Sequence, residues 1–447
     1  MPDVLLVTPP SRRGQSGPEA EENLGLAFVA SALRREGISA EILDANLEGW
    51  TLSRTIREIE TRTFKAIGLS MVFSPLVKSG RELLYAVGSL QSPARQFVTA
   101  AGGHVPSLAY HLMLRDTCPP DLIVRGEGER AFPEVMKKIL GNQDWRNVPG
   151  VAYLGEGGVA CTPPGPLIED LDNLAPPAHD TLRKALAGGS RATIYSSRGC
   201  YGHCSFCSIS AFYGLSPGQK WRAMSAEPTV DEVERLVKDY GAANVFFTDD
   251  NFIGPGRAGR ERAAAVAEEV LSRGLKVALN IFIRANDVDR PVLELLKRAG
   301  LRQVFIGVES GAQSALDRYQ KGVTVEQNRE ALRTLIDLGL EPVLGFIIFD
   351  PYSTLSEIAA SMEFLGDAQL ARVKLNARLD ARNRLEAYEG TPIVDRLREE
   401  GRLSGDYVDY HYSFRDPLVG LLHWVLSSAR SLTAPVRALS WRLGRPK

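Results

Sequence analysis

The sequence has few cysteines, no excess of either charge and no long apolar run. Only five cysteines occur in 447 residues, which is too few for a framework of disulfides to hold a chain of this size. Lysine and arginine total 53 against 54 for aspartate and glutamate, so no overall field attracts nucleic acid. No apolar stretch approaches the ~20 residues of a membrane-spanning helix. The first residues also lack the basic region and the cleavage site of a signal peptide.

A chain of this length is expected to form two or three domains. Over 1–145, short apolar runs alternate with amphipathic segments, which predicts an α/β domain with a doubly wound, flavodoxin- or Rossmann-like sheet. The predicted strands are 4–7, 40–43, 66–70, 96–100 and 122–124. Residues 146–190 are rich in acids and prolines, and we expect a linker there.

A second alternating series begins at Thr193. Its predicted strands are 193–196, 244–248, 277–283, 303–308, 342–349 and 372–375. Six such units predict a partial (β/α)6 barrel of the TIM type over 191–385, followed by a C-terminal extension over 386–447. Capping boxes at Thr229 and Thr324 predict two of the helix starts. Barrel chemistry lies at the C-terminal ends of the strands, so candidate site residues are sought there.

The main chemical motif is the spacing C-x3-C-x2-C formed by Cys200, Cys204 and Cys207. Three thiolates can ligate three irons of a [4Fe–4S] cluster and leave the fourth iron open to another ligand. A zinc site usually takes four Cys or His ligands. His203 is the only nearby candidate for the fourth, and it stands between two of the cysteines. The motif therefore favours an iron–sulfur cluster over zinc.

With this motif the chain resembles the radical S-adenosylmethionine (SAM) superfamily. The resemblance implies that the open iron chelates SAM, which is cleaved reductively to methionine and a 5′-deoxyadenosyl radical. It also implies an electron donor, such as a flavodoxin, a ferredoxin or a dehydrogenase. Because the cluster is sensitive to oxygen and the cysteines are reduced, we expect a cytoplasmic enzyme.

The same resemblance assigns residues to SAM. Phe206 matches the apolar position against the adenine, although ordinary burial in a loop also explains it. Asp249 or Asp250, at the end of the second barrel strand, is a candidate for the SAM amino group, and two acids there could equally cap a helix. Arg284, at the end of the third strand, is a candidate clamp for the SAM carboxylate.

The later strands supply further candidates. The fourth strand ends in Gly-Val-Glu-Ser-Gly, which strongly resembles the ending used in this superfamily, so Glu309 and Ser310 are candidates for the SAM amino group and ribose. The fifth strand departs from the usual pattern and leaves Asp350 for the substrate. Arg378 belongs to an alternating polar segment that predicts an inner wall facing SAM or substrate, although a surface edge strand would show the same pattern.

Glycines gather at the expected edge of the N-terminal sheet. Gly102, Gly103 and His104 follow the fourth strand, and Gly126 follows the fifth. Tight turns would explain this spacing, yet it also resembles the cobalamin-binding domain that precedes many radical SAM barrels. The D-x-H-x-x-G motif, which donates a histidine to cobalt in other cobalamin proteins, is absent. We therefore expect cobalamin without a protein imidazole ligand, or a domain that binds none.

These features predict a radical SAM enzyme that modifies an unactivated carbon of a small polar metabolite, with methyl transfer if cobalamin is bound. Without cobalamin, the chain resembles the radical SAM diol dehydratases of aminoglycoside biosynthesis, which implies a role in antibiotic biosynthesis. A tRNA-modifying radical SAM enzyme and a non-catalytic Fe–S scaffold are two further hypotheses. The basic segment after Asp416 could cap the barrel, remain disordered or lie on a membrane as an amphipathic helix.

Overall fold

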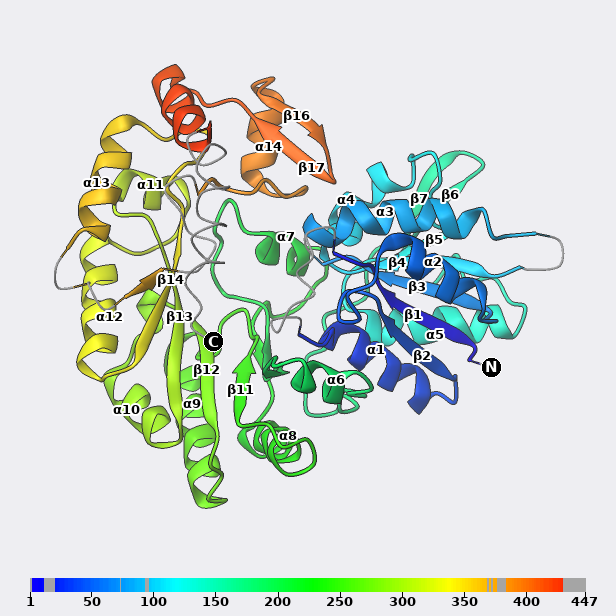
Figure 1. The fold of residues 1–447 in the computed structure, drawn as a ribbon, viewed down its shortest axis with the longest axis horizontal. Coiled ribbons are helices and arrows are strands. Elements are labelled where there is room, and N and C mark those ends of the chain that lie inside the picture. The colour runs from blue at the N-terminus through cyan, green and yellow to red at the C-terminus, as the bar shows by residue number, and fades with distance from the viewer. Residues whose placement is uncertain are drawn as a thin grey trace, which may run out of the picture.

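The computed structural model describes residues 2–11, 21–72, 74–92, 96–367, 370, 373–375 and 383–428. Figure 1 shows two α/β units side by side, the N-terminal one in blue and cyan and the barrel in green and yellow. The C-terminal extension, in orange, lies across the top of the gap between them. The predicted fold class is confirmed.

The N-terminal sheet has the strand order β2-β1-β3-β4-β5-β6-β7. The bounds are β1 (Val4–Thr8), β2 (Ala40–Asp44), β3 (Ala66–Ser70), β4 (Val98–Gly102), β5 (Leu122–Val124), β6 (Val151–Gly155) and β7 (Gly158–Cys161). The first five strands are parallel in the flavodoxin-like order. The hairpin β6–β7 adds two antiparallel strands within the stretch expected to be a linker.

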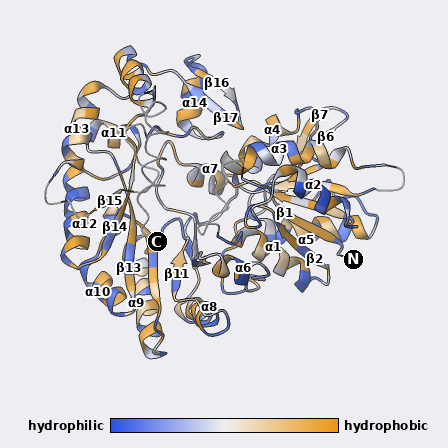
Figure 2. Ribbon diagram, viewed as in Figure 1, coloured by the Kyte–Doolittle hydropathy of each residue, from blue (hydrophilic) through white to orange (hydrophobic). Residues whose placement is uncertain are grey.

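Helices cover both faces of this sheet. The helices are α1 (Leu24–Arg35) and α5 (Gly128–Leu140) on one face, and α2 (Leu52–Glu60), α3 (Ser74–Gly88) and α4 (His104–Met113) on the other. In β1, Val4 and Leu6 pack into the first core, and Leu5 and Val7 into the second. Burial on both faces explains the continuous apolar run of this strand. Figure 2 shows the strands of the sheet mostly orange and the covering helices in mixed colours.

The barrel sheet is parallel, with the order β15-β14-β13-β12-β11-β8. Its strands are β8 (Ala192–Ile194), β11 (Asn244–Phe247), β12 (Ala278–Arg284), β13 (Leu301–Glu309), β14 (Glu341–Phe346) and β15 (Lys374–Leu375). Five helices pack outside it: α8 (Ala226–Lys238), α9 (Gly256–Ser272), α10 (Arg290–Arg298), α12 (Val325–Asp337) and α13 (Leu355–Leu365). Because each strand neighbours the next in sequence and the first and last do not pair, the barrel is open.

The inner wall of the barrel is layered. Near its N-terminal end, Asn280 donates to Asn244 at 2.5 Å. Above this pair, the rings of Phe246, Phe282 and Phe305 pack with centroids 4.7–5.5 Å apart. On β12 this aromatic layer fills the inner face between Asn280 and Arg284. This packed base confines the open space to the C-terminal ends of the strands.

One of the two predicted helix starts is wrong. Thr324 forms the expected capping box at the start of α12. Helix α8, in contrast, begins four residues before the predicted position, after Ser225. Thr229 is buried within the helix and donates to the carbonyl oxygen of Ser225 at 2.7 Å. The glutamate of the predicted box, Glu232, turns instead toward the segment between the two units.

A buried histidine joins these units. His179 Nδ1 lies 2.5 Å from Glu22, which precedes α1, and Nε2 lies 2.6 Å from Glu232 of α8. Burial lowers the pKa of His179, but the hydrogen bonds to the two carboxylates outweigh it, and the pKa is raised above its ordinary value. Because each ring nitrogen faces a carboxylate, this imidazole links the N-terminal unit to the barrel.

The extension makes a second connection. It contains α14 (Pro392–Glu399), β16 (Leu403–Asp406) and β17 (Asp409–Tyr412). On the barrel side, the backbone N–H of Ile393 donates to Ser205 at 3.1 Å. On the other side, Tyr407 donates to Asp116, and Arg81 pairs with Asp406 at 2.7 Å. The extension thus spans the gap between the units.

Residues 417–428 form a last helix. Val419 packs into the barrel core, and Leu418, Leu421, Trp424 and Val425 are exposed. The packing of Val419 fits the predicted cap over the barrel, and the basic residues from Arg430 onward lie outside the described part. Among the described helices, none has both the length and the apolarity needed to cross a membrane.

Candidate active site

The three cysteines lie in a loop between β9 (Ser197–Arg198) and α7 (Ser208–Gly214), above the end of β8. Gly199 opens the loop with φ +78°, and a Cβ there would lie 1.9 Å from the carbonyl oxygen of Lys220, so only glycine fits. The loop then turns back at Cys204, whose carbonyl oxygen accepts from the N–H of Cys207 at 3.1 Å. All three thiols are free of disulfides and come from one short segment.

The donor set suits a cluster better than a single ion. Within the described residues, no three Cys, His, Asp or Glu side chains are close enough to hold one metal ion. A cubane cluster separates its thiolates further than a tetrahedral zinc ion does, because each thiolate binds a different iron. His203, the candidate fourth ligand for zinc, is exposed. Burial raises the pKa of Cys207 to about 12, so its thiolate forms when a metal replaces the proton.

Arg284 lies directly against the cysteine loop. Its Nη1 atom is 3.5 Å from Cys204 Sγ, and its Nη2 atom donates to the carbonyl oxygen of Lys321. A Cβ at Gly202 would lie 2.1 Å from Nη1, so glycine makes room for the guanidinium. Arg284 was predicted to clamp the SAM carboxylate. In the structure it faces the thiols, where its charge offsets that of a bound cluster.

Glu309 lies at the mouth of the barrel, where β13 ends. Its backbone has φ +68°, which is unusual for a residue other than glycine, and its carboxylate is paired with Lys321 at 3.0 Å. A Cβ at Gly307 would lie 2.6 Å from Glu309 Oε1, so Gly307 leaves the space that this carboxylate occupies. Strain at this strand end, together with a half-buried charge, fits a residue held in position for a ligand.

We propose that Glu309 binds the SAM ammonium, and Glu309→Gln tests this. The substitution removes the charge but keeps the shape and the backbone strain, so SAM affinity should fall by about one to two decades, from the roughly 1.5–3 kcal/mol of a charged hydrogen bond. Equilibrium dialysis with the cluster-loaded protein measures the effect, and the iron content should not change. Unaltered SAM affinity would leave Glu309 as a structural partner of Lys321.

Three other predicted residues are engaged within the protein. Asp249 is fully buried and accepts from the backbone N–H and hydroxyl of Ser196 at 2.7 and 2.6 Å. Ser310 Oγ accepts from the N–H of Ala312 at 3.1 Å. Asp350, expected to be left for the substrate, is fully buried and accepts from Arg318 and Tyr319 at 2.8 and 2.7 Å. All three therefore hold the strand ends in place.

The remaining candidates have different positions. Asp250, the neighbour of Asp249, accepts from the N–H of Gly199 at 2.9 Å and reaches a cavity. Burial raises the pKa of Asp250 to about 7. Phe206 is half-buried at the barrel mouth, with its ring 5.2 Å from that of Tyr319. Arg378 lies outside the described residues.

A cavity of about 760 Å³ lies between the two units, and we call it the interdomain cavity. The four predicted residues Gly102, Gly103, His104 and Gly126 line its sheet side, together with Thr8 and Gly128. Apolar side chains such as Leu6 and Phe132 line its inner end, whereas Tyr195 and Asp250 line it from the barrel. The glycine turns expected at one edge of the sheet therefore lie together, and the cavity that they line is also lined by barrel residues.

Backbone geometry explains the glycines of this cavity. Gly103 has φ +103°, and a Cβ there would lie 2.9 Å from the carbonyl oxygen of Met71. Burial lowers the pKa of the adjacent His104 to about 4, so its imidazole is neutral near pH 7. The ring packs 4.2 Å from that of Phe212 of α7. Helix α7 therefore connects the cysteine loop to this edge of the sheet.

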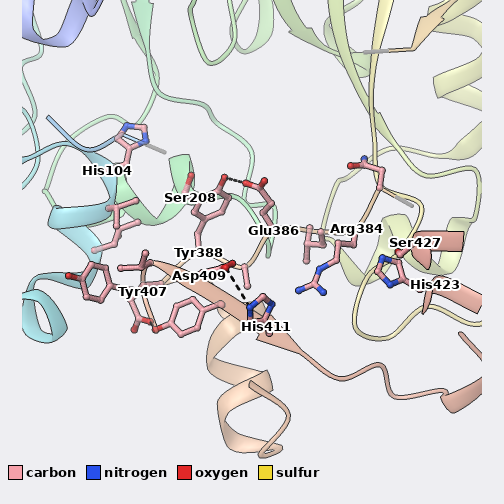
Figure 3. A pocket seen from close by; sticks show the side chains of 18 residues that line it. His104, Ser208, Arg384, Glu386, Tyr388, Tyr407, Asp409, His411, His423 and Ser427 are labelled. Atoms are coloured by element: carbon pink, nitrogen blue, oxygen red, sulfur yellow. Dashed lines mark hydrogen bonds and ion pairs between the residues drawn. The ribbon is translucent and has the colours of Figure 1, made fainter. Parts of the chain in front are cut away.

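Figure 3 shows a second cavity, of about 550 Å³, which we call the polar cavity. His104 lines both cavities, and Ser208, next to Cys207, lines the polar one. The other polar side chains belong mainly to the extension and the last helix: Arg384, Glu386, Tyr388, Glu389, Asp409, Tyr410, His411 and His423. Sequence reasoning missed this cavity, because its residues form no motif and are scattered between His104 and Ser427.

Two family models match the chain. Residues 194–365 match the radical SAM superfamily, and residues 17–136 match the B12 binding domain. A solved structure of the cobalamin-dependent SAM radical enzyme OxsB, with aqua-cobalamin and SAM bound, superposes with a TM-score of 0.81. The superposition covers 97% of this chain and 67% of OxsB at 23% identity. The radical SAM methyltransferase TsrM from Kitasatospora setae gives a TM-score of 0.71 at 18% identity, over 90% of this chain and 75% of TsrM.

Curated relatives have similar layouts. An uncharacterized methyltransferase of Pyrococcus horikoshii is 29% identical over 81% of this chain and 77% of its own length. The 4′-phospho-dehydrooxetanocin synthase of Priestia megaterium is 28% identical over 77% of this chain, which spans 48% of that protein. The hopanoid C-3 methylase of Methylococcus capsulatus is 31% identical over 74% of this chain, which spans 61% of that protein.

The fold, the cysteine loop and the two family matches together define an enzyme built from two cofactor-binding α/β units. Residues 194–365 form a radical SAM domain, and the N-terminal unit that precedes it is a B12-binding domain. The predicted cofactors, a [4Fe–4S] cluster, SAM and cobalamin, are confirmed by these two domains.

The residues present fit these cofactors. Three thiols in one loop provide the three cysteine ligands of a cluster with an open iron. At the interdomain cavity, the bare backbone of Gly102, Gly103 and Gly126 allows close approach of a large ring system at the carboxyl ends of the strands.

Proposed function

We propose that this enzyme transfers a methyl group to an unactivated carbon of a small polar metabolite. One observation carries the proposal: the interdomain cavity and the polar cavity share His104, and both border the cysteine loop. Asp250 of the first cavity bonds to Gly199, and Ser208 of the second follows Cys207. A substrate in the polar cavity would therefore lie beside the places for cobalamin and for the cluster.

The cofactors would supply the chemistry. A [4Fe–4S] cluster held by Cys200, Cys204 and Cys207 would supply the electron for reductive cleavage of SAM, and cobalamin held at the interdomain cavity would supply the methyl group. The residues of this chain position the groups. Arg284 compensates the charge of the thiolates, and Glu309 with Lys321 orients the amino-acid part of SAM. The His104–Phe212 contact and the extension form part of the walls of the cavities.

The names of the relatives support methyl transfer but do not all agree. Two of the curated relatives described above are called methyltransferase or methylase, and TsrM is called a methyltransferase. Others are called a dehydrooxetanocin synthase and, in Rubrivivax gelatinosus, an anaerobic magnesium-protoporphyrin IX monomethyl ester cyclase. A cobalamin-dependent radical rearrangement is therefore the second candidate function. Dehydration of an aminoglycoside-type sugar stays a prediction from the sequence.

We further propose that electrons reach the cluster from a flavodoxin- or ferredoxin-type protein in a reducing compartment. Reductive cleavage of SAM consumes an electron that the chain itself does not supply. Dithionite can replace the protein donor in vitro.

The test follows the products of SAM. Purified with hydroxocobalamin, reconstituted anaerobically and reduced, the enzyme should convert SAM both to S-adenosylhomocysteine and to 5′-deoxyadenosine, even in slow turnover without substrate. The first product reports methyl loss from SAM and should require cobalamin, whereas the second reports radical cleavage and should not. Liquid chromatography with mass spectrometry quantifies both. Formation of 5′-deoxyadenosine alone in the cobalamin-loaded enzyme would contradict methyl transfer and favour the rearrangement.

A further inference from the structure

The polar cavity contains charged groups of both signs, and most have partners within the protein. Glu389 pairs with Arg398 at 2.7 Å and accepts from Tyr410. Glu386 accepts from Tyr388. The remaining acid, Asp409, pairs with His411 at 3.5 Å. Each carboxylate of the cavity therefore has a donor of its own.

Arg384 differs from these groups. No carboxylate lies within ion-pair distance of it among the residues that the structure describes. Its guanidinium carbon lies 4.4 Å above the ring of Tyr412, and its backbone forms a bridge to Phe349 beyond the end of β14. Stacking on an aromatic ring fixes a guanidinium while leaving its N–H groups free to donate.

Arg384 lies at one end of the polar cavity. Figure 3 shows its side chain entering the cavity near His411 and His423, with His104 on the opposite side. His104 marks the boundary with the interdomain cavity. A substrate group bound at Arg384 would thus lie far from the interdomain cavity, and the rest of the substrate would extend toward that cavity.

From this geometry we infer that the substrate carries an anionic group, a phosphate or a carboxylate, which binds Arg384 at the far end of the polar cavity. Planar guanidinium forks match the paired oxygens of both groups. The inference rests on the proposed function in one respect, that the polar cavity is the substrate site. It adds a substrate class and a residue that sets specificity.

The test uses small anions on the holoenzyme loaded with cluster and cobalamin. Phenyl phosphate and benzoate differ only in the anionic group, and benzyl alcohol is the neutral control. Isothermal titration should detect at least one of the anions and not the alcohol. Arg384→Gln should weaken that binding at least tenfold, and Arg384→Lys should weaken it less, because the charge remains.

Arg396 provides a matched control. Its guanidinium also lies over a tyrosine ring, 4.2 Å from that of Tyr352, but it pairs with Glu400 and is not part of the cavity lining. Arg396→Gln should bind the anions as the wild type does. Iron and cobalamin contents should be equal in all variants, which shows that they are folded.

Three results would overturn the inference. They are failure of both anions to bind, equal anion binding by Arg384→Gln and wild type, and a tenfold loss of SAM affinity in Arg384→Gln, which would place Arg384 in the SAM site. Binding of one anion and not the other supports the inference and selects phosphate or carboxylate. Absence of S-adenosylhomocysteine from the wild type would contradict methyl transfer without changing any of these binding results.

Discussion

Replacement of Cys200, Cys204 and Cys207 by alanine is expected to remove the cluster and abolish SAM cleavage. Anaerobic reconstitution of the wild type should give about four irons per chain, and the triple variant should retain essentially none. Without the cluster, nothing next to the sulfonium can reduce SAM. The amount of 5′-deoxyadenosine formed should therefore fall below detection. Iron analysis and product quantification under dithionite measure the two effects.

The other two cysteines provide the matched control. Cys161 is exposed and Cys118 is half-buried, and neither lies in the cysteine loop. A Cys118→Ala, Cys161→Ala double variant should keep its iron and its activity. SAM cleavage by the triple variant would refute the assignment of the cluster, whereas iron loss from the double variant would show that the assay reports general destabilisation.

Gly102→Leu is expected to displace cobalamin while leaving the cluster active. A Cβ at Gly102 meets only the carbonyl oxygen of Val124, at an ordinary 3.7 Å, and its φ is not positive. The backbone therefore accepts the substitution, and the larger side chain extends into the interdomain cavity. Overpacking costs roughly 1–3 kcal/mol, or about five- to hundred-fold in cobalamin affinity. Corrin absorbance retained after gel filtration measures the loss.

The control for this variant is Gly157→Leu. Gly157 lies in the turn between β6 and β7, where a Cβ meets nothing within 4 Å. That variant should retain cobalamin fully, and both variants should still form 5′-deoxyadenosine. Wild-type cobalamin content in Gly102→Leu would show that the corrin binds elsewhere.

The strands and the cysteine loop could be predicted because they rest on local signals. In β1 and β12, the alternation of side chains between the two faces is a property of the backbone, and each prediction placed the strand within two residues. The cysteine spacing is equally local. The roles of neighbouring residues were harder to predict: Asp249 accepts from Ser196 and Asp250 from Gly199, and of the two only Asp250 lines the interdomain cavity.

The other differences depend on contacts between distant residues. Arg318 and Tyr319 donate hydrogen bonds to the carboxylate of Asp350. Glu232 bonds to His179 in the segment before the barrel, and not to the helix start that was predicted. The polar cavity is the extreme case, because it forms only when residues beyond 380 fold back over α4. No local pattern marks such a site, since each of its residues is ordinary in its own segment.

The imidazole bridge at His179 has a consequence for how the enzyme operates. Parting the two units would leave an imidazole and two carboxylates without their partners. It would also break the contacts of Asp116 and Arg81, in the N-terminal unit, with Tyr407 and Asp406 of the extension. Leaving buried charges unpaired costs several kcal/mol. We therefore expect the B12-binding domain to stay in a fixed position beside the barrel during turnover and not to move between two sites. SAM and the substrate must then enter and leave through the openings of this fixed assembly, and we expect their passage through those openings to limit the turnover rate.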